Sequence, residues 1–159
     1  MHPNAETIHR FYEAFTRRDH AAMGACYAPD AAFADEVFTL TGARVPAMWH
    51  MLCENGEDLA VTFGDVSADD RSGRAHWEAT YTFSVTGRKV HNVLDAEFTF
   101  RDGLISTHRD RFDLWKWTRM ALGAPGVLLG WSPIVRGKVR AMAAKNLDGF
   151  VATHPEYQR

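Results

Sequence analysis

The feature that most constrains the fold is a change in the spacing of apolar residues near residue 59. Before it, apolar side chains recur at helical spacing, and after it apolar and polar residues alternate. Turn residues such as Asp102-Gly103 divide the alternating part. The pattern predicts strands at 59–66, 74–85, 89–100 and 104–113. Strands joined by tight turns form an antiparallel meander.

Helix signals occur before the predicted sheet. Asn4 can cap a first helix, Asp19 a second helix that runs to Tyr27, and Thr41 a third. A short extended piece at 32–35 separates the second helix from the third. Helices followed by a curved antiparallel sheet make an α+β protein. We expect a cone-shaped fold with the helices packed on a strongly bent sheet, and with a ligand pocket at the mouth of the cone.

The tail of the chain shows helical patterning again. Residues 114–131 predict a short helix and then a loop, and Ser132-Pro133 predicts the start of a last helix. This last helix has apolar residues at helical spacing opposite a basic face. A helix of this kind can bind a membrane surface or an acidic partner. We expect instead that its apolar side packs on the domain or on a second subunit and that its charges face solvent.

Composition excludes several classes of protein. A chain of 159 residues fits one domain, and its net charge of −2 disfavours nucleic-acid binding. The chain shows no signal-peptide pattern and no apolar run of membrane-spanning length, so we expect a cytoplasmic protein with no membrane partner. Cys26 and Cys53 are interpreted as buried free thiols. No nicotinamide, flavin or phosphate-binding motif occurs, and no cofactor is expected.

Two stretches resemble a known superfamily. Residues 27–35 (Tyr-Ala-Pro-Asp-Ala-Ala-Phe-Ala-Asp) are similar to the helix-to-strand passage of nuclear transport factor 2-like proteins. Residues 102–113 (Asp-Gly-Leu-Ile-Ser-Thr-His-Arg-Asp-Arg-Phe-Asp) resemble the last strand of its SnoaL-like polyketide cyclases, shared in part with limonene epoxide hydrolase. The resemblance implies a SnoaL-like α+β cone domain at 1–115. Residues 116–159 are then a helical extension packed on the same domain.

The resemblance also implies roles for three aspartates. Asp35 and Asp95 fall where ketosteroid isomerases place a general base and a protonated acid, respectively, although Phe11 replaces their hydrogen-bonding tyrosine. The neighbouring Tyr12 is expected to point elsewhere on its helix. Asp110 falls on the acid/base aspartate of the epoxide hydrolase and the cyclases.

The epoxide hydrolase also needs an Arg and a second Asp on the preceding long strand. Ala79 and Tyr81 stand at those positions. The resemblance therefore favours a single acid/base carboxylate, which is closer to what the cyclases use.

Strand alternation places some of these residues on shared faces. His108, Asp110 and Phe112 share one face of the last strand, and His91 shares a face with Asp95 on the strand before it. We interpret both faces as inward. A carboxylate on an inward face must be paired or hydrogen-bonded. It is then either a proton-transfer group with a shifted pKa or part of a structural pair. Both interpretations remain open for His108 and His91 as well.

These observations lead to one set of site residues. The predicted catalytic residues are Asp110, Asp35 and Asp95, and the predicted substrate-binding residues are Tyr81, His91, Trp49, Trp77, Phe33 and Phe112. No metal is expected, because these residues lack a recognisable ligand spacing.

Three functions follow in order of preference. The first is cofactor-independent acid/base catalysis on a small apolar carbonyl compound, of cyclase, isomerase or dehydratase type. The second is binding of a hydrophobic small molecule without chemistry, and the third is a protein-interaction domain. A homodimer is expected, with the polar convex face of the sheet as one possible contact.

Overall fold

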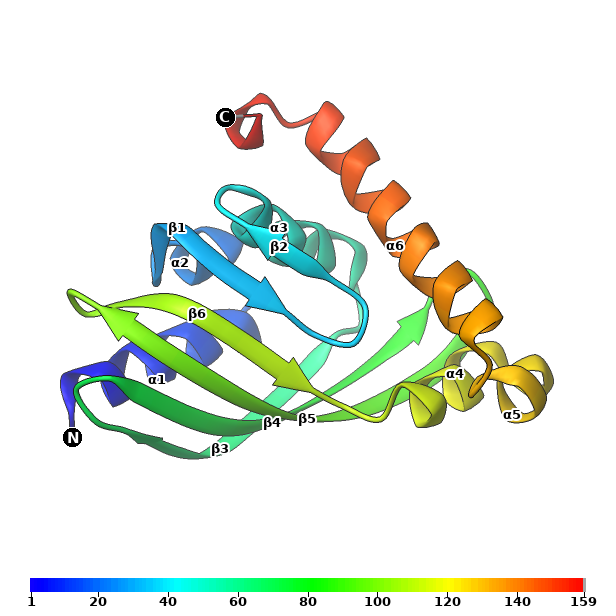
Figure 1. Ribbon diagram of the computed structural model, residues 1–159, viewed down its shortest axis with the longest axis horizontal. Coiled ribbons are helices and arrows are strands. Elements are labelled where there is room, and N and C mark those ends of the chain that lie inside the picture. The colour runs from blue at the N-terminus through cyan, green and yellow to red at the C-terminus, as the bar shows by residue number, and fades with distance from the viewer. Residues whose placement is uncertain (159) are drawn as a thin grey trace.

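A computed structural model describes residues 1–158 and shows one six-stranded sheet with helices on its concave side (Figure 1). The strand order is β2-β1-β6-β5-β4-β3. The strands are β1 (Tyr27–Ala34), β2 (Thr39–Thr41), β3 (Ala60–Ala68), β4 (Ser72–Phe83), β5 (Arg88–Arg101) and β6 (Leu104–Arg111). All pairings are antiparallel except the parallel pair β1–β6. The predicted meander is thus confirmed, within a mixed α+β fold.

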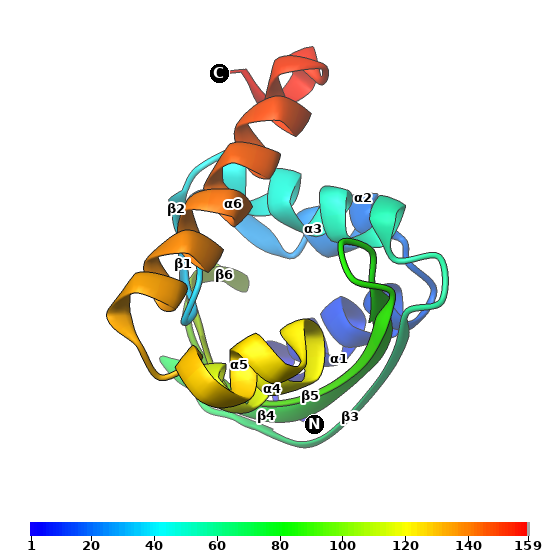
Figure 2. The ribbon, with the colours of Figure 1, turned by 90° about the vertical axis from the view of Figure 1, so that its right-hand side faces the viewer.

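Three helices precede the meander and three follow it. They are α1 (Pro3–Thr16), α2 (His20–Gly24), α3 (Arg44–Asn55), α4 (Leu114–Leu122), α5 (Ala124–Leu129) and α6 (Pro133–Ala152), followed by a 3₁₀ turn η1 (Pro155–Tyr157). Figure 2 looks into the open end of the curled sheet, with α4 and α5 at one rim and α3 and α6 at the other. None of the helices in residues 1–158 has the length and apolar character needed to cross a membrane.

The core lies between α1, α3 and the concave face of the sheet. Phe11 and Phe15 of α1 are buried and meet the ring of Trp49 from α3 edge-on, at centroid distances of 5.4 and 5.2 Å. Trp77 of β4 completes the group, 6.2 Å from Trp49. Each fully buried large side chain contributes about 1.5–3 kcal/mol to folding. This aromatic cluster therefore fixes α1 and α3 on the sheet.

Irregularities in the strands bend the sheet. The β3–β4 register shifts between Gly64 and Ser67, and Asp65 between them has a φ of 52°. A second shift in the β5–β6 pairing lies between Thr99 and Phe100. Bulges of this kind increase local twist and bend a strand. They give the sheet the curvature that encloses a cavity on its concave side.

Several predicted helix boundaries are wrong at the N-terminal end. Pro3 occupies the first turn of α1, so the cap is His2, whose Nδ1 accepts from the Asn4 backbone N–H at 3.1 Å. The Asn4 side chain instead donates to the Asp69 carbonyl in the β3–β4 turn at 3.0 Å. Thr41 ends β2 rather than capping α3. Helix α2 stops at Gly24, because residues from Tyr27 onward pair with β6.

The tail is more helical than predicted. Residues 124–129, expected to be a loop, form the short helix α5. Helix α6 begins at Pro133 as predicted, and Ser132 Oγ accepts from the Ile134 backbone N–H at 3.2 Å. Val139 and Leu147 are buried as the helical pattern indicates, whereas Ile134 is 70% exposed.

Candidate functional site

A cavity of about 260 Å³ lies between the concave face of the sheet and the helices α3, α4 and α6. Its walls are mostly apolar and aromatic. The sheet side includes Trp77, Ala79, Tyr81, Phe83, Leu94 and Phe112, and the helix side includes Met48, Trp49, Met51, Trp117, Val139 and Met142. Its few polar groups include Asp110, Asp35, Tyr81 and Asn92. The inner face of β4 is thus formed by Trp77, Ala79, Tyr81 and Phe83.

Asp110 on β6 is the buried carboxylate of this cavity, with a side chain that is 1% exposed. Its Oδ1 accepts hydrogen bonds from Trp77 Nε1 at 3.2 Å and from His108 Nε2 at 2.9 Å. Its Oδ2 has no hydrogen-bond partner within residues 1–158. A buried carboxylate needs such donors, and both of them meet a single oxygen. The other oxygen keeps its full capacity to accept a proton.

The proton positions in this network follow from what each group can donate. Trp49 Nε1 donates to Tyr27 Oη at 2.9 Å, and Tyr27 Oη lies 2.7 Å from His108 Nδ1. Burial raises the pKa of Tyr27 well above its ordinary value, so this phenol keeps its single proton. We assign Tyr27 as the donor to Nδ1, which places a proton of His108 on Nε2, facing Asp110. His108 is the satisfied buried histidine that the sequence left as one alternative.

Asp35, directly after β1, is the second carboxyl group of the cavity. Its Oδ1 accepts the backbone N–H groups of Val37 and Phe38 at 2.7 and 2.6 Å. Burial raises the pKa of Asp35 to about 6 in spite of these donors, and the negative charge of Asp110 acts in the same direction. Near neutral pH a fraction of Asp35 is therefore protonated and can donate a proton.

Tyr81 supplies a hydroxyl group to the cavity. Its oxygen accepts from Trp117 Nε1 of α4 at 2.7 Å, which leaves its own proton free to donate. Burial is the main cause that raises the pKa of Tyr81, and the charge of Asp35 adds to it. The chain thus brings together a buried carboxylate, a carboxyl group with a raised pKa and a phenolic donor in one apolar cavity.

Asp95 and His91 lie outside the cavity, and their predicted placement is wrong. The apolar residues Val90, Leu94 and Ala96 of β5 are buried on the inner face, and period-two alternation turns the residues between them outward. The side chains of Asp95 and His91 are 78% and 56% exposed.

On that outer face the two residues belong to a surface network. His76 lies 3.0 Å from Asp95 and 2.9 Å from Glu78, and His91 lies 2.8 Å from Glu78. These solvent-exposed pairings account for the position of Asp95, which therefore needs no role in the cavity.

The other predicted residues divide into cavity walls and core. Trp49, Trp77 and Phe112 line the cavity, whereas Phe33 is buried in the core, where it meets Trp49 and His108 edge-on. Tyr12 was expected to point away from the site, yet it is buried. Burial is the main cause that raises the pKa of Tyr12, and the negative charge of Asp110 raises it further.

The cavity residues that sequence reasoning missed include Asn92, Trp117 and Asn146. Asn92 shares the inner face of β5 with Val90 and Leu94, and that alternation is the signal that could have found it. Trp117 and Asn146 come from the tail, and no motif in the sequence marks them.

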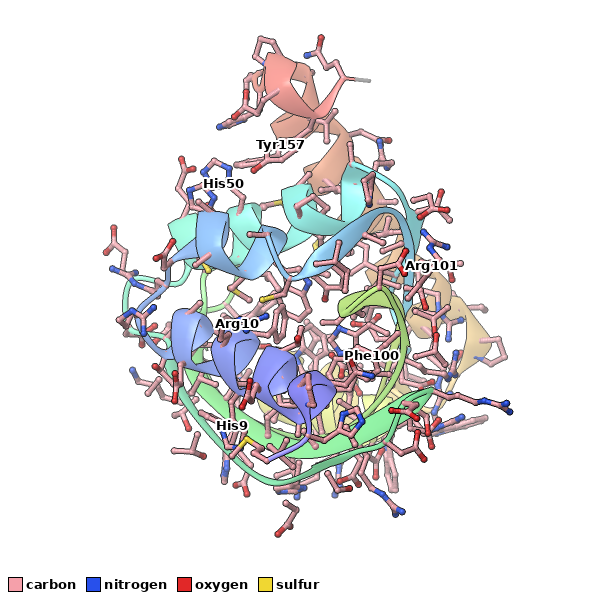
Figure 3. The ribbon with its side chains drawn as sticks, turned by 90° about the vertical axis from the view of Figure 1, so that its left-hand side faces the viewer. His9, Arg10, His50, Phe100, Arg101 and Tyr157 are labelled. Carbon is pink, nitrogen blue, oxygen red and sulfur yellow. The ribbon has the colours of Figure 1, made fainter. Side chains whose placement is uncertain are left out.

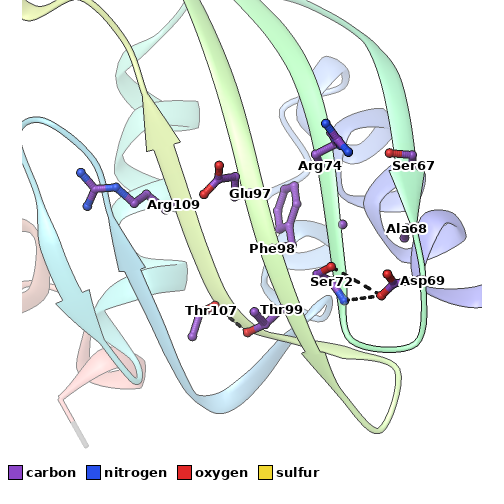
Figure 4. A pocket seen from close by; sticks show the side chains of 11 residues that line it. Ser67, Ala68, Asp69, Ser72, Arg74, Glu97, Phe98, Thr99, Thr107 and Arg109 are labelled. Atoms are coloured by element: carbon purple, nitrogen blue, oxygen red, sulfur yellow. Dashed lines mark hydrogen bonds between the residues drawn. The ribbon is translucent and has the colours of Figure 1, made fainter.

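A larger hollow of about 690 Å³ lies elsewhere, near the β3–β4 turn (Figure 4). Exposed polar side chains such as Ser72, Arg74, Glu97 and Thr99 line most of it. It is open to solvent, and none of its charged groups is buried. The smaller cavity is therefore the candidate site, because it combines enclosure with titratable groups in an apolar setting.

Comparison with known proteins agrees with this architecture. The pattern of the SnoaL-like domain matches residues 8–108. The chain belongs to the SnoaL-like domain family. No curated protein matches it.

Solved structures share the fold of this SnoaL-like domain. A nuclear transport factor 2-like protein of unknown function from Burkholderia pseudomallei is 21% identical, with 76% of this chain and 98% of that one covered and a TM-score of 0.65. A putative polyketide cyclase from Xanthomonas campestris is also 21% identical, with 74% and 96% covered and a TM-score of 0.62. An epoxide hydrolase from M. tuberculosis is 17% identical, with 79% and 92% covered and a TM-score of 0.63.

Asp35 should give this SnoaL-like domain a measurable pH dependence of stability. The pKa of Asp35 is about 6 in the folded state and 3.8 ordinarily, so ionisation of Asp35 destabilises the fold. The stability that protonated Asp35 contributes is therefore complete below pH 3.8 and is lost as the pH rises through 6. Asp35→Asn removes the charge and keeps an oxygen for Val37 and Phe38. Urea unfolding should show Asp35→Asn to be more stable than wild type by about 1 kcal/mol at pH 4.5 and by about 3 kcal/mol at pH 7.5.

The matched control is Glu36→Gln, the adjacent acidic residue, which should follow the wild-type pH profile. An Asp35→Asn variant whose stability runs parallel to wild type from pH 4.5 to 7.5 would show that Asp35 titrates normally.

Proposed function

We propose that this protein is a cofactor-independent acid–base catalyst acting on a small, largely apolar carbonyl compound, in a reaction of cyclase, isomerase or dehydratase type. The observation that carries the proposal is the free Oδ2 of Asp110. This oxygen belongs to a buried carboxylate whose other oxygen is held by Trp77 and His108. A positioned carboxylate with one unengaged oxygen in an apolar cavity has the features of a general base.

The surrounding groups suit removal of a proton next to a carbonyl group. Asp110 takes the proton from carbon, and the electron pair moves onto the carbonyl oxygen to give an enolate. That oxygen needs a donor in a site shielded from water. Tyr81 has a free hydroxyl proton, and Asp35, with a pKa of about 6, supplies an acidic proton near neutral pH. Two carboxyl groups with different environments can thus divide the roles of base and acid.

The cavity limits the size and polarity of the ligand. Its volume of about 260 Å³ exceeds the ~150 Å³ that accommodates benzene, and is below the ~300 Å³ at which pockets for drug-sized ligands begin. A ligand of one or two rings fits these bounds. Its aromatic and aliphatic walls favour a hydrocarbon skeleton with one or two oxygen functions.

The solved structures that share this fold include proteins with several different activities, so the fold alone does not indicate which reaction this chain catalyses. Epoxide hydrolysis has less support than carbonyl chemistry, because Ala79 and Tyr81 stand where the resemblance to limonene epoxide hydrolase requires Arg and Asp. Binding without catalysis is the second candidate. It is favoured by the hydrogen bonds that hold Asp110 Oδ1, since the same network can be purely structural.

Exchange of carbon-bound hydrogen for deuterium tests the proposal without knowledge of the natural substrate. We would incubate the protein in D₂O with 2-tetralone and a panel of one- and two-ring ketones, and follow loss of the α-proton signal by NMR. The wild type should accelerate exchange for at least one ketone. Asp110→Asn should reduce that acceleration by about 100-fold or more, the usual contribution of a general base.

Asp95→Asn is the matched control, because it removes a carboxylate from the neighbouring strand but from the opposite face of the sheet. It should leave exchange unchanged. Ketones that bind, as judged by quenching of tryptophan fluorescence, but exchange no faster than in buffer would favour the non-catalytic alternative. Equal exchange by the wild type and Asp110→Asn would rule out Asp110 as the base.

A further inference from the structure

Outside the cavity, three metal-binding side chains meet where α3 passes the end of α6. His50 and Glu54 lie one turn apart on α3, with His50 Nε2 3.3 Å from Glu54 Oε2. His154 follows α6, and one ligand atom from each of the three residues lies within 4.8 Å of the others. Figure 3 shows His50 at this edge, with Tyr157 beside it. No part of the proposed catalytic chemistry uses this cluster.

Hydrogen bonds hold the rings of His50 and His154 in the way that they commonly hold metal-binding histidines. His154 Nδ1 lies 2.7 Å from the Phe150 carbonyl oxygen, and His50 Nδ1 lies 2.9 Å from Tyr157 Oη. The Phe150 carbonyl can only accept, so Nδ1 of His154 carries the proton and Nε2 of His154 keeps a lone pair. His50 likewise has its Nδ1 engaged by a protein oxygen and its Nε2 toward Glu54. Metal-binding histidines commonly show this arrangement, in which a carbonyl or similar group fixes the tautomer of the ligand ring.

We propose that His50, Glu54 and His154 form a Zn²⁺ site that fastens the end of α6 to α3. Two imidazoles and one carboxylate are a ligand set that zinc accepts, with the fourth position taken by water. Donors on one tetrahedral zinc ion lie about 3.4 Å apart, as His50 and Glu54 already do, so His154 needs only a small side-chain movement. Both helices line the cavity, so the metal would also hold the helix side of the cavity together.

No metal is expected from the histidines and aspartates of the sheet and of the predicted pocket, and His50, Glu54 and His154 lie outside both sets. The spacing of His50 and Glu54, four residues apart on one helical face, was a usable signal. His154 lies about a hundred residues further on, and only the fold brings it to α3.

Cobalt spectroscopy on tag-free, chelator-treated protein tests the site. One equivalent of Co²⁺ should produce visible d–d bands, one equivalent of Zn²⁺ should abolish them, and Zn²⁺ should raise the Tm. His154→Ala and Glu54→Gln should each weaken Zn²⁺ binding at least ~10-fold, the lower end for loss of a ligand or its support. Glu54 is on the surface, so the second variant keeps the test valid if His154→Ala folds poorly.

His91→Ala, which removes an exposed histidine of the outer sheet face, should bind metal like the wild type. Absence of Co²⁺ bands in the wild type, or equal Zn²⁺ affinity in all four proteins, would overturn the proposal.

A second and independent observation concerns α5 and the start of α6. Five large apolar residues there are at least half exposed, namely Val127, Leu128, Leu129, Trp131 and Ile134. They lie at the far end of the molecule from the N-terminus (Figure 1). Contiguous exposed apolar residues in a folded domain mark a contact surface. We call this group the α5 patch.

Charge indicates what the α5 patch contacts. Residues 114–147 contain six basic residues and no Asp or Glu, so the rest of the chain carries 12 basic and 20 acidic residues, a net −8. Of the six basic residues, Lys116, Lys138, Arg140 and Lys145 are exposed, whereas Arg119 lies over the Trp115 ring and Arg136 donates to the Gly130 carbonyl. A second copy placed symmetrically on this surface would bring like charges together. An anionic lipid surface instead provides both an apolar layer and opposite charge.

We infer that the α5 patch docks on anionic membranes. The exposed apolar residues enter the headgroup boundary, and exposed basic residues such as Lys138 contact lipid phosphates. The absence of an apolar run of membrane-spanning length led us to expect no membrane partner, but a surface-bound helix needs no such run. Ile134, on the apolar side of the last helix, is exposed.

Co-sedimentation with vesicles tests this inference. The wild type should bind vesicles of phosphatidylcholine and phosphatidylglycerol (7:3) more tightly than pure phosphatidylcholine, and 0.5 M NaCl should weaken the binding. The double variant Leu128→Glu/Trp131→Ser should lose at least ~10-fold in affinity, because it removes apolar contact and adds a negative charge. Val93→Ser, at an exposed site on the outer sheet face, is the control and should bind normally.

Absence of binding to anionic vesicles would overturn the inference. Light scattering supplies the competing result, since a dimer that Leu128→Glu/Trp131→Ser converts to monomer would assign the α5 patch to a second copy of the chain.

Discussion

The structure depends on how a carboxylate is kept inside an apolar cavity. Asp110 is 1% exposed, and burying an unpaired charge costs several kcal/mol. Its Oδ1 offsets part of that cost by accepting from Trp77 of β4 and His108 of β6. His108 is fixed in turn by Tyr27 of β1, which accepts from Trp49 of α3. One chain of hydrogen bonds therefore joins three strands and one helix, and every step has a defined donor. The same chain that secures the core leaves Asp110 Oδ2 unused.

The cavity is finished by parts of the chain outside the matched domain. Residues 8–108 match the SnoaL-like pattern, yet Asp110 and Phe112 lie just beyond that match. Helices α4 and α6 then supply Trp117, Val139 and Met142 to the walls. Trp117 also sets the direction of the Tyr81 hydroxyl by donating to its oxygen. In this chain the tail therefore shapes the ligand space as well as covering it.

Much of the fold could be predicted because apolar spacing records which face of each strand is buried. The alternation of residues 74–85 placed β4 correctly, and the motif at 102–113 placed β6. Asp95 was placed wrongly because the resemblance to ketosteroid isomerases was given more weight than the alternation of β5. In that strand Val90, Leu94 and Ala96 occupy the inner face.

Long-range contacts could not be predicted from local pattern. Trp117 reaches Tyr81 across 36 residues, and Arg88 donates to the Met120 carbonyl across 32. The partner of His108 is more distant still, since Tyr27 lies 81 residues away. Such contacts follow from the curvature of the sheet, and the bulges at Asp65 and near Thr99 that produce it carry no strong sequence signal.

The central claim is that Asp110 accepts a hydrogen bond from His108 Nε2 through Oδ1 and keeps Oδ2 free to take a proton. Long-range ¹H–¹⁵N correlation NMR on protein labelled with ¹⁵N-histidine measures this directly. The account predicts, near pH 7, a protonated Nε2 and an unprotonated Nδ1 for His108. A proton on Nδ1 with a bare Nε2 would mean that Asp110 is protonated and donates to His108, and the proposed base would then already hold its proton.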